Sequence, residues 1–140
     1  MTTEAELKEK LRKIEALFAG AATAGERNAA QAARDRIQAR QREMEAREGP
    51  IEMRFSLSDG WNVKLFLALC RRYGLKPYRL RGQRRTTVML KVVRTFANDI
   101  LWPEFTQLAA ALTTYLNEAT ERIIHEEVFK NTDEPGEGQG

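Results

Sequence analysis

Residues 65–92 read LFLALCRRYGLKPYRLRGQRRTTVMLKV, an apolar run that passes into a strongly basic one. In a helix predicted over residues 59–73, apolar side chains surround almost the whole circumference, so this helix should be mostly buried. Ser58 is its expected N-cap, and Gly74 provides the expected stop after its last turn. The segment therefore predicts a central core helix that ends where a basic region begins.

Alternating apolar and polar residues after Gly74 predict a two-stranded antiparallel β-hairpin. Tyr78 and Leu80 give the first strand an apolar face, and Gly82 lies at the turn. The apolar face of the second strand is formed by Val88, Leu90 and Val92. Because an isolated hairpin is marginal in water, we expect the helices on either side to cover this face.

A long amphipathic helix is predicted after Thr95. Pro103 should kink it or mark the start of its main segment. Apolar residues then recur at helical spacing to about Phe129. This stripe consists of Phe105, Leu108, Leu112, Tyr115, Leu116, Ala119 and Ile123. The polar, glycine-rich residues 131–140 are expected to be disordered.

Two further helices are predicted at the start of the chain. Thr3 and Glu6 have the spacing of a capping box, and helical periodicity follows to about Ala19. The second helix is predicted over residues 26–47, with a face of small and apolar side chains toward the first helix. That face contains Ala29, Ala30, Ala33, Ile37 and Met44. These features predict an antiparallel helical hairpin, which Gly49-Pro50 ends.

The predicted fold class is α+β and mostly helical, with four parts along the chain. Residues 1–48 form the helical hairpin, and residues 49–58 form a linker with a short extended segment. Residues 59–130 form an α-β-β-α unit that contains the basic hairpin and the long C-terminal helix. Residues 131–140 form the tail.

The stretch AGERNAAQAARDRIQARQREME (residues 24–45), which follows a Leu/Ile-rich helix, resembles a bacterial and phage family known as domain of unknown function 2786. The mark of that family is a helical hairpin with an Ala-rich second helix. Residues 65–92 and LAAALTTYL (108–116) are similar to the helix–hairpin–helix unit that often follows it. The resemblance implies this architecture, and it implies no mechanism, because the family has no established activity.

Composition and isolated reactive residues disfavour several functional classes. No apolar run approaches the ~18 residues that span a bilayer, and the charged N-terminus lacks a signal-peptide core, so we expect a cytoplasmic protein. Cys70 is the single cysteine and His125 the single histidine. A disulfide framework, a multi-cysteine zinc site and a two-histidine metalloprotease helix are thereby excluded. We expect no enzymatic activity, no cofactor and no metal.

Charge is segregated along the chain. Residues 60–98 contain ten Lys or Arg and no Asp or Glu, whereas residues 99–140 contain nine acidic and two basic side chains. Guanidinium and ammonium groups at this density bind phosphates. A basic hairpin also fits a groove of duplex DNA or follows an RNA backbone. The predicted nucleic-acid-binding residues are Lys64, Arg71, Arg72, Lys76, Arg79, Arg81, Gln83, Arg84, Arg85 and Lys91.

Three interpretations of this basic region stay open at the level of sequence. The favoured one is non-catalytic binding of nucleic acid, DNA more than RNA. The others are pairing with the acidic C-terminal helix, within or between chains, and contact with an acidic protein. An alternative function is a protein–protein adaptor or a phage-like assembly component that uses the acidic helix and the Ala-rich hairpin. The spacing of Trp61, Tyr73 and Tyr78 favours core packing over base stacking.

The long helix also predicts self-association. Its apolar residues alternate at spacings of four and three, which is typical of a two-helix seam. These residues are Leu101, Phe105, Leu108, Leu112, Tyr115 and Ala119. A short hairpin cannot cover so long a helix, so part of the seam needs the N-terminal hairpin or a second copy. We expect a symmetric homodimer.

Overall fold

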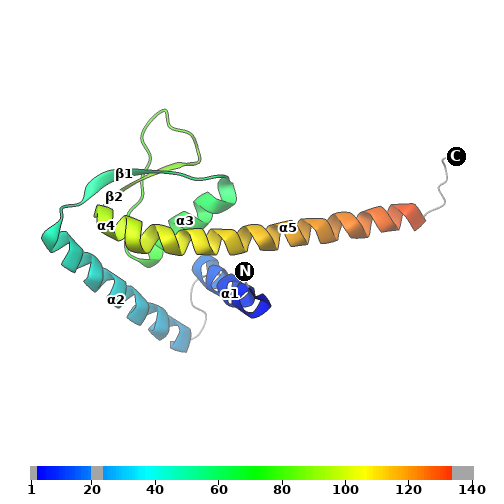
Figure 1. Ribbon diagram of the computed structural model, residues 1–140, viewed down its shortest axis with the longest axis horizontal. Coiled ribbons are helices and arrows are strands. Elements are labelled where there is room, and N and C mark those ends of the chain that lie inside the picture. The colour runs from blue at the N-terminus through cyan, green and yellow to red at the C-terminus, as the bar shows by residue number, and fades with distance from the viewer. Residues whose placement is uncertain (1–2, 20–23, 134–140) are drawn as a thin grey trace.

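Helices form most of the fold, and a small antiparallel sheet lies beside them (Figure 1). The computed structural model describes residues 3–19 and 24–133. The elements in chain order are α1 (Glu4–Ala19), α2 (Ala24–Arg47), β1 (Ile51–Ser56), α3 (Gly60–Arg72), β2 (Thr87–Val92), α4 (Arg94–Phe96), the π-helical turn η1 (Ala97–Leu101) and α5 (Trp102–Asp133). The predicted mostly helical α+β class is therefore confirmed.

The sheet joins β1 to β2 along the full length of both strands, with Phe55 opposite Val88. A two-stranded antiparallel sheet was the correct prediction, but the first strand comes from the predicted linker. The residues after Gly74 instead fold back on β2 as a hairpin-shaped loop with one bridge, between Tyr78 and Met89. Pairing goes no further, because the chain enters a tight turn in which the Gln83 N–H donates to the Leu80 carbonyl at 3.3 Å.

Both faces of β2 are covered. The three predicted inward residues, Val88, Leu90 and Val92, are buried in the core, as expected. Met89 on the opposite face is also buried, because the loop that carries Tyr78 lies against it. Leu80 was predicted to face inward and is 44% exposed, since the chain has already left the sheet at that point.

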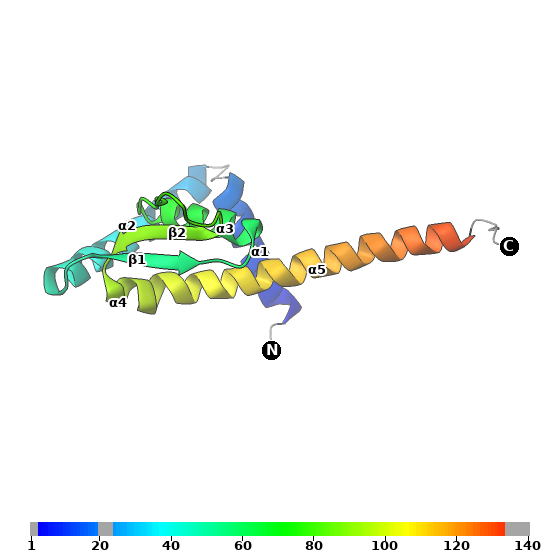
Figure 2. The ribbon, with the colours of Figure 1, turned by 90° about the horizontal axis from the view of Figure 1, so that it is seen from above.

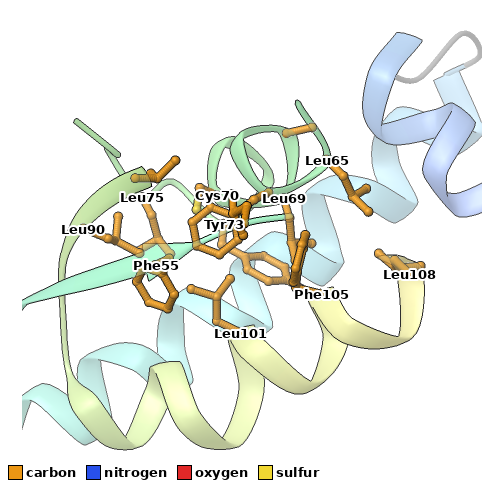
Figure 3. Packing of buried hydrophobic residues seen from close by; sticks show 14 of the residues in the cluster. Phe55, Leu65, Leu69, Cys70, Tyr73, Leu75, Leu90, Leu101, Phe105 and Leu108 are labelled. Atoms are coloured by element: carbon orange, nitrogen blue, oxygen red, sulfur yellow. The ribbon is translucent and has the colours of Figure 1, made fainter. Parts of the chain in front are cut away.

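The main core lies between the inner face of the sheet, α3 and the first turns of α5 (Figure 3). Aromatic rings form its centre. The Phe66 ring lies 4.8 Å from that of Phe55 and 5.3 Å from that of Phe105, centre to centre. Such tilted and edge-on pairs add to the free energy of apolar burial. The core therefore fixes α3 against both the sheet and the long helix.

Both ends of α3 are closed by specific hydrogen bonds. The N-cap is Asp59 instead of the predicted Ser58, because the Asp59 carboxylate accepts the Asn62 N–H at 2.9 Å. Ser58 accepts a bond from the Asn62 side chain. At the other end, Gly74 has φ 74° and allows the Leu75 N–H to reach the Cys70 carbonyl at 2.9 Å. This is the predicted glycine stop.

The helical segments α4, η1 and α5 follow one another without a break. In η1 the Trp102 N–H bonds to the Ala97 carbonyl, five residues earlier, which widens the turn. A wide turn gives the ring of Pro103 room against the carbonyl four positions before it. Pro103 is the second residue of α5, so it marks the start of the main segment, as predicted.

The two N-terminal helices both join the rest of the molecule. The capping box at the start of α1 is confirmed, with the Thr3 and Glu6 side chains bonding reciprocally to backbone N–H groups. Ile14 and Leu17 of α1 are buried in the main core, since α1 packs on α5 and α3. The helical hairpin is thus present but shares a core with residues 59–112 instead of forming a separate part.

The second helix, α2, packs beside the C-terminal end of α3. Its Gln38 side chain donates to the Tyr73 carbonyl at 3.4 Å. Ile37 and Met44 are partly buried and pack against the main core. Part of the face predicted to meet the first helix therefore contacts the core. The side chains of Ala29 and Ala30 lie outside the described part, and the contact predicted for them with the first helix is not described.

The long helix α5 packs against the core as far as Leu116 and then projects beyond the other elements (Figures 1 and 2). Its first half supplies Phe105, Leu108 and Leu112 to the core. Tyr115 is 47% exposed and Ile123 is 62% exposed, although both belong to the predicted stripe. The helix continues to Asp133, past the predicted start of the tail at 131. Residues 134–140 lie outside the described part.

No helix in the described residues is apolar over a length sufficient to cross a membrane.

Candidate nucleic-acid interface

Six of the predicted site residues belong to the loop that joins α3 to β2. We call residues 76–85 the basic loop; it stands away from the sheet in Figure 1. The bridge between Tyr78 and Met89 closes its base, with backbone bonds of 2.9 and 2.8 Å. Gly82, with φ 84°, forms its tip as predicted, since a positive φ at this position is typical of a tight turn.

Two side chains of the basic loop form hydrogen bonds to the loop itself or to β2. The Gln83 side chain accepts the Leu80 N–H at 3.0 Å and donates to the Met89 sulfur at 3.2 Å. The Arg79 guanidinium donates to the Arg85 carbonyl across the loop. These contacts hold the loop in shape, so Gln83 and Arg79 support the surface that their neighbours form.

The remaining cations of the loop are open to solvent. Lys76, Arg81, Arg84 and Arg85 are exposed. None of them forms an ion pair with another described residue. Four cations held on one short loop repel one another in water, and an anionic ligand would relieve that repulsion.

The end of α3 brings further cations beside the loop. Arg71 is exposed and Arg72 is partly buried. The Nε–H of Arg34 from α2 donates to the Arg72 carbonyl at 3.0 Å, which adds a third guanidinium at this helix end. Cations are favoured there because the helix dipole places partial negative charge at the C-terminus. Arg34 is not among the predicted site residues, because only the packing of α2 on α3 brings it to this helix end.

Lys64 and Lys91 lie at the margins of this surface. The ammonium of Lys64 sits 5.3 Å from the ring centre of Trp61. Lys91 lies opposite Glu52 in the sheet register, so a carboxylate faces it across the strands. Glu52 also accepts a hydrogen bond from Tyr78, and that bond raises the pKa of the Tyr78 phenol. The outer face of the sheet is therefore less positive than the basic loop.

The aromatic residues have different environments. Tyr73 is buried, as predicted, and donates a hydrogen bond to Glu104 at the start of α5. Tyr78 is partly buried against β2. Trp61 is 50% exposed, so its predicted core position is wrong. The reason is its place in the first turn of α3, where the core-facing positions are taken by Val63 and Leu65.

The predicted alternative of ion pairing with the acidic helix is not seen between the described residues of one chain. In the described part, the ion pairs lie inside α1, joining Lys8 to Glu4 and Arg12 to Glu9. The acidic residues Glu118, Glu121, Glu126 and Glu127 lie on the projecting half of α5. That half extends away from the basic loop in Figures 1 and 2.

The isolated reactive residues do not form a catalytic cluster in the described part of the chain. Cys70 is fully buried, and desolvation raises the pKa of its thiol to about 12, so the nucleophilic thiolate is suppressed. His125 is exposed on α5. Among residues 3–19 and 24–133, no group of three or more His, Cys, Asp and Glu side chains is placed to hold a metal ion.

Comparison with known proteins adds no further assignment: the chain matches no family model, no curated protein and no solved structure. The resemblance to domain of unknown function 2786 therefore stays a prediction.

Proposed function

We propose that the protein binds nucleic acid, without catalysing a reaction, through the basic loop and the adjacent C-terminal end of α3. The observation that carries this proposal is the exposure of Lys76, Arg81, Arg84 and Arg85 without acidic partners in the described part of the chain. Arginines present planar forks that bind phosphate oxygens in pairs. The site is expected to contact the phosphate backbone first.

Duplex DNA is the favoured ligand. The major groove of B-form DNA is about 12 Å wide and admits a narrow projecting loop, whereas the A-form groove of RNA is deep and narrow. The exposed ring of Trp61 beside Lys64 offers a second kind of contact, stacking on an unpaired base. Because neither phosphate contacts nor ring stacking reads the identity of a base, binding should tolerate many sequences.

A mobility-shift assay tests the proposal. Wild-type protein is expected to retard duplex DNA more strongly than single-stranded DNA or RNA, and the shift should weaken as salt rises. The triple variant Arg81→Ala, Arg84→Ala, Arg85→Ala should lose most of the affinity and keep its fold, because all three side chains are exposed. Unchanged binding by this variant would rule out the loop as the site.

The matched control removes the same charge elsewhere. Arg36, Arg40 and Arg42 are exposed on α2, outside the basic loop and the end of α3. Their replacement with alanine lowers the net charge by the same amount as the loop variant. Binding by this control should stay within a few-fold of wild type if position, and not total charge, sets the affinity.

A second role is favoured by a different observation. The projecting half of α5 exposes the large apolar side chains Tyr115, Ile123 and Ile124. Exposed apolar side chains of this size on a soluble helix mark a protein contact. We therefore keep protein–protein interaction, as an adaptor or an assembly component, as the function of this half of the helix.

A further inference from the structure

The projecting half of α5 is an extension of a buried helix face. Leu108 and Leu112 are buried, and the next residues on the same face, at spacings of three and four, are Tyr115, Ala119 and Ile123. Tyr115 is 47% exposed and Ile123 is 62% exposed, although both continue the face that is buried at Leu112. An isolated helix of this length is marginal in water, so a docking surface would stabilise it.

This half of α5 combines apolar and acidic side chains, which defines the chemistry of its partner. Between residues 113 and 128 the charged side chains other than His125 are four glutamates and Arg122. Like charges exclude nucleic acid as the ligand here. The partner must offer apolar area surrounded by cations.

The chain itself carries such a surface. Trp61 and Leu80 are exposed at 50% and 44%, and both stand among the cations of α3 and the basic loop. The Leu57 N–H bonds to the Thr86 carbonyl, which holds the start of α3 beside the end of that loop. Within one chain the two surfaces do not meet, because α5 carries its acidic half away from the loop (Figures 1 and 2).

We propose that the projecting half of α5 docks on the basic loop and the start of α3 of a second copy of this chain. Apolar contacts of Tyr115, Ile123 and Ile124 with Trp61 and Leu80 would be flanked by glutamate–arginine pairs. A reciprocal exchange, in which each copy supplies one helix and one loop, closes the assembly as a two-fold dimer. This arrangement differs from the predicted seam, whose residues Leu101 to Leu112 are already buried within the chain.

Such docking has a consequence for ligand binding. Because the same arginines would receive either the acidic helix or a phosphate backbone, duplex DNA should dissociate the dimer. This consequence rests on the proposed function. The dimer itself does not, since it is measured without nucleic acid.

A charge-swap experiment tests the dimer. One variant reverses the helix (Glu121→Lys, Glu126→Lys, Glu127→Lys), and the other reverses the loop (Arg81→Glu, Arg84→Glu, Arg85→Glu). Light scattering at micromolar concentration should give the wild type twice the chain mass of 16.0 kDa and each variant alone a single chain mass. An equimolar mixture of the two variants should recover the dimer, because opposite charges then face each other at every contact.

The control reverses three exposed cations of α2 (Arg36→Glu, Arg40→Glu, Arg42→Glu) and should dimerise like the wild type. Circular dichroism of each variant checks that its fold is retained. A dimer re-formed in the mixture would also show that both variants are folded. A wild type of 16.0 kDa over the whole concentration range would overturn the proposal. So would a loop-reversed variant that still dimerises, or a mixture that stays monomeric. Failure to bind DNA would leave the charge-swap result unaffected.

Discussion

Cys70 shows how burial removes the chemistry of a reactive side chain. Its thiol is fully buried in α3, and desolvation raises its pKa from 9.0 to about 12. The native protein should therefore react with a thiol reagent at pH 8 far more slowly than the protein in denaturant. Equal rates in the two states would show that α3 is not buried as described.

The same pKa shift predicts how stability changes at alkaline pH. The folded state keeps the Cys70 proton up to about pH 12, whereas the unfolded state releases it near pH 9. Stability is thus fully present below pH 9 and falls as the pH rises toward 12. Tyr73 acts in the same direction, because burial and its bond to Glu104 raise its pKa too. Urea unfolding of Cys70→Ala should show a smaller alkaline loss than the wild type.

Gly74 has a left-handed backbone conformation that residues with a side chain rarely adopt. Its φ of 74° disfavours any side chain, and a Cβ there would lie 2.3 Å from Nε2 of Gln38. Gly74→Ala should lower the free energy of unfolding by about 1–2 kcal/mol, since it adds left-handed strain and disturbs the bond from Gln38 to Tyr73. Gly60→Ala is the control, because a Cβ there meets nothing within 4 Å. Equal effects of the two changes in urea unfolding would refute this account of the helix end.

Single residues were predictable where local backbone chemistry decides the outcome. Gly74, Gly82 and the capping box of α1 are in the predicted places, because each depends on neighbours within a few positions. Trp61 was placed wrongly in the core, since its exposure depends on which face of α3 meets the sheet and α5. That choice is made by tertiary packing and leaves no local signal.

The two halves of α5 differ in what each side chain contributes. Leu112 is 6% exposed in the core, and Ile123 is 62% exposed on the projecting half. Leu112→Ala should cost about 2–5 kcal/mol of unfolding free energy, and Ile123→Ala should stay within about 0.5 kcal/mol. Urea unfolding at low protein concentration measures both changes. A small loss for Leu112→Ala would place this part of the helix on the surface.

Among the elements, the positions of the helices were predicted correctly, whereas the strand that pairs with β2 was predicted wrongly. Helical periodicity over many residues identified α1, α2, α3 and α5, with ends within a few positions of those observed. The strand β1 was predicted only as a short extended segment, because six residues carry too little periodicity to compete with the adjacent hairpin pattern. Pairing across the intervening α3 depends on the core that Phe55 shares with Phe66.

At the level of the whole molecule, the candidate site was predictable in composition but not in arrangement. Charge segregation identified the basic loop and its neighbours from the sequence. Only the fold shows that Arg79 and Gln83 bond within the loop, that Lys91 faces Glu52, and that Arg34 joins the end of α3. These differences arise because contacts between distant segments set the environment of each charge.

The salt dependence of DNA binding distinguishes phosphate contacts of the basic loop from general attraction by a positive protein. Each cation that contacts a phosphate contributes about 0.9 to the slope of log K against log salt concentration. Replacing Arg81, Arg84 and Arg85 with alanine should therefore flatten the slope by about 2.7 if each contacts one phosphate. The α2 control lacking Arg36, Arg40 and Arg42 should keep the wild-type slope. Equal slopes for the two triple variants would contradict the assignment of the basic loop as the nucleic-acid interface.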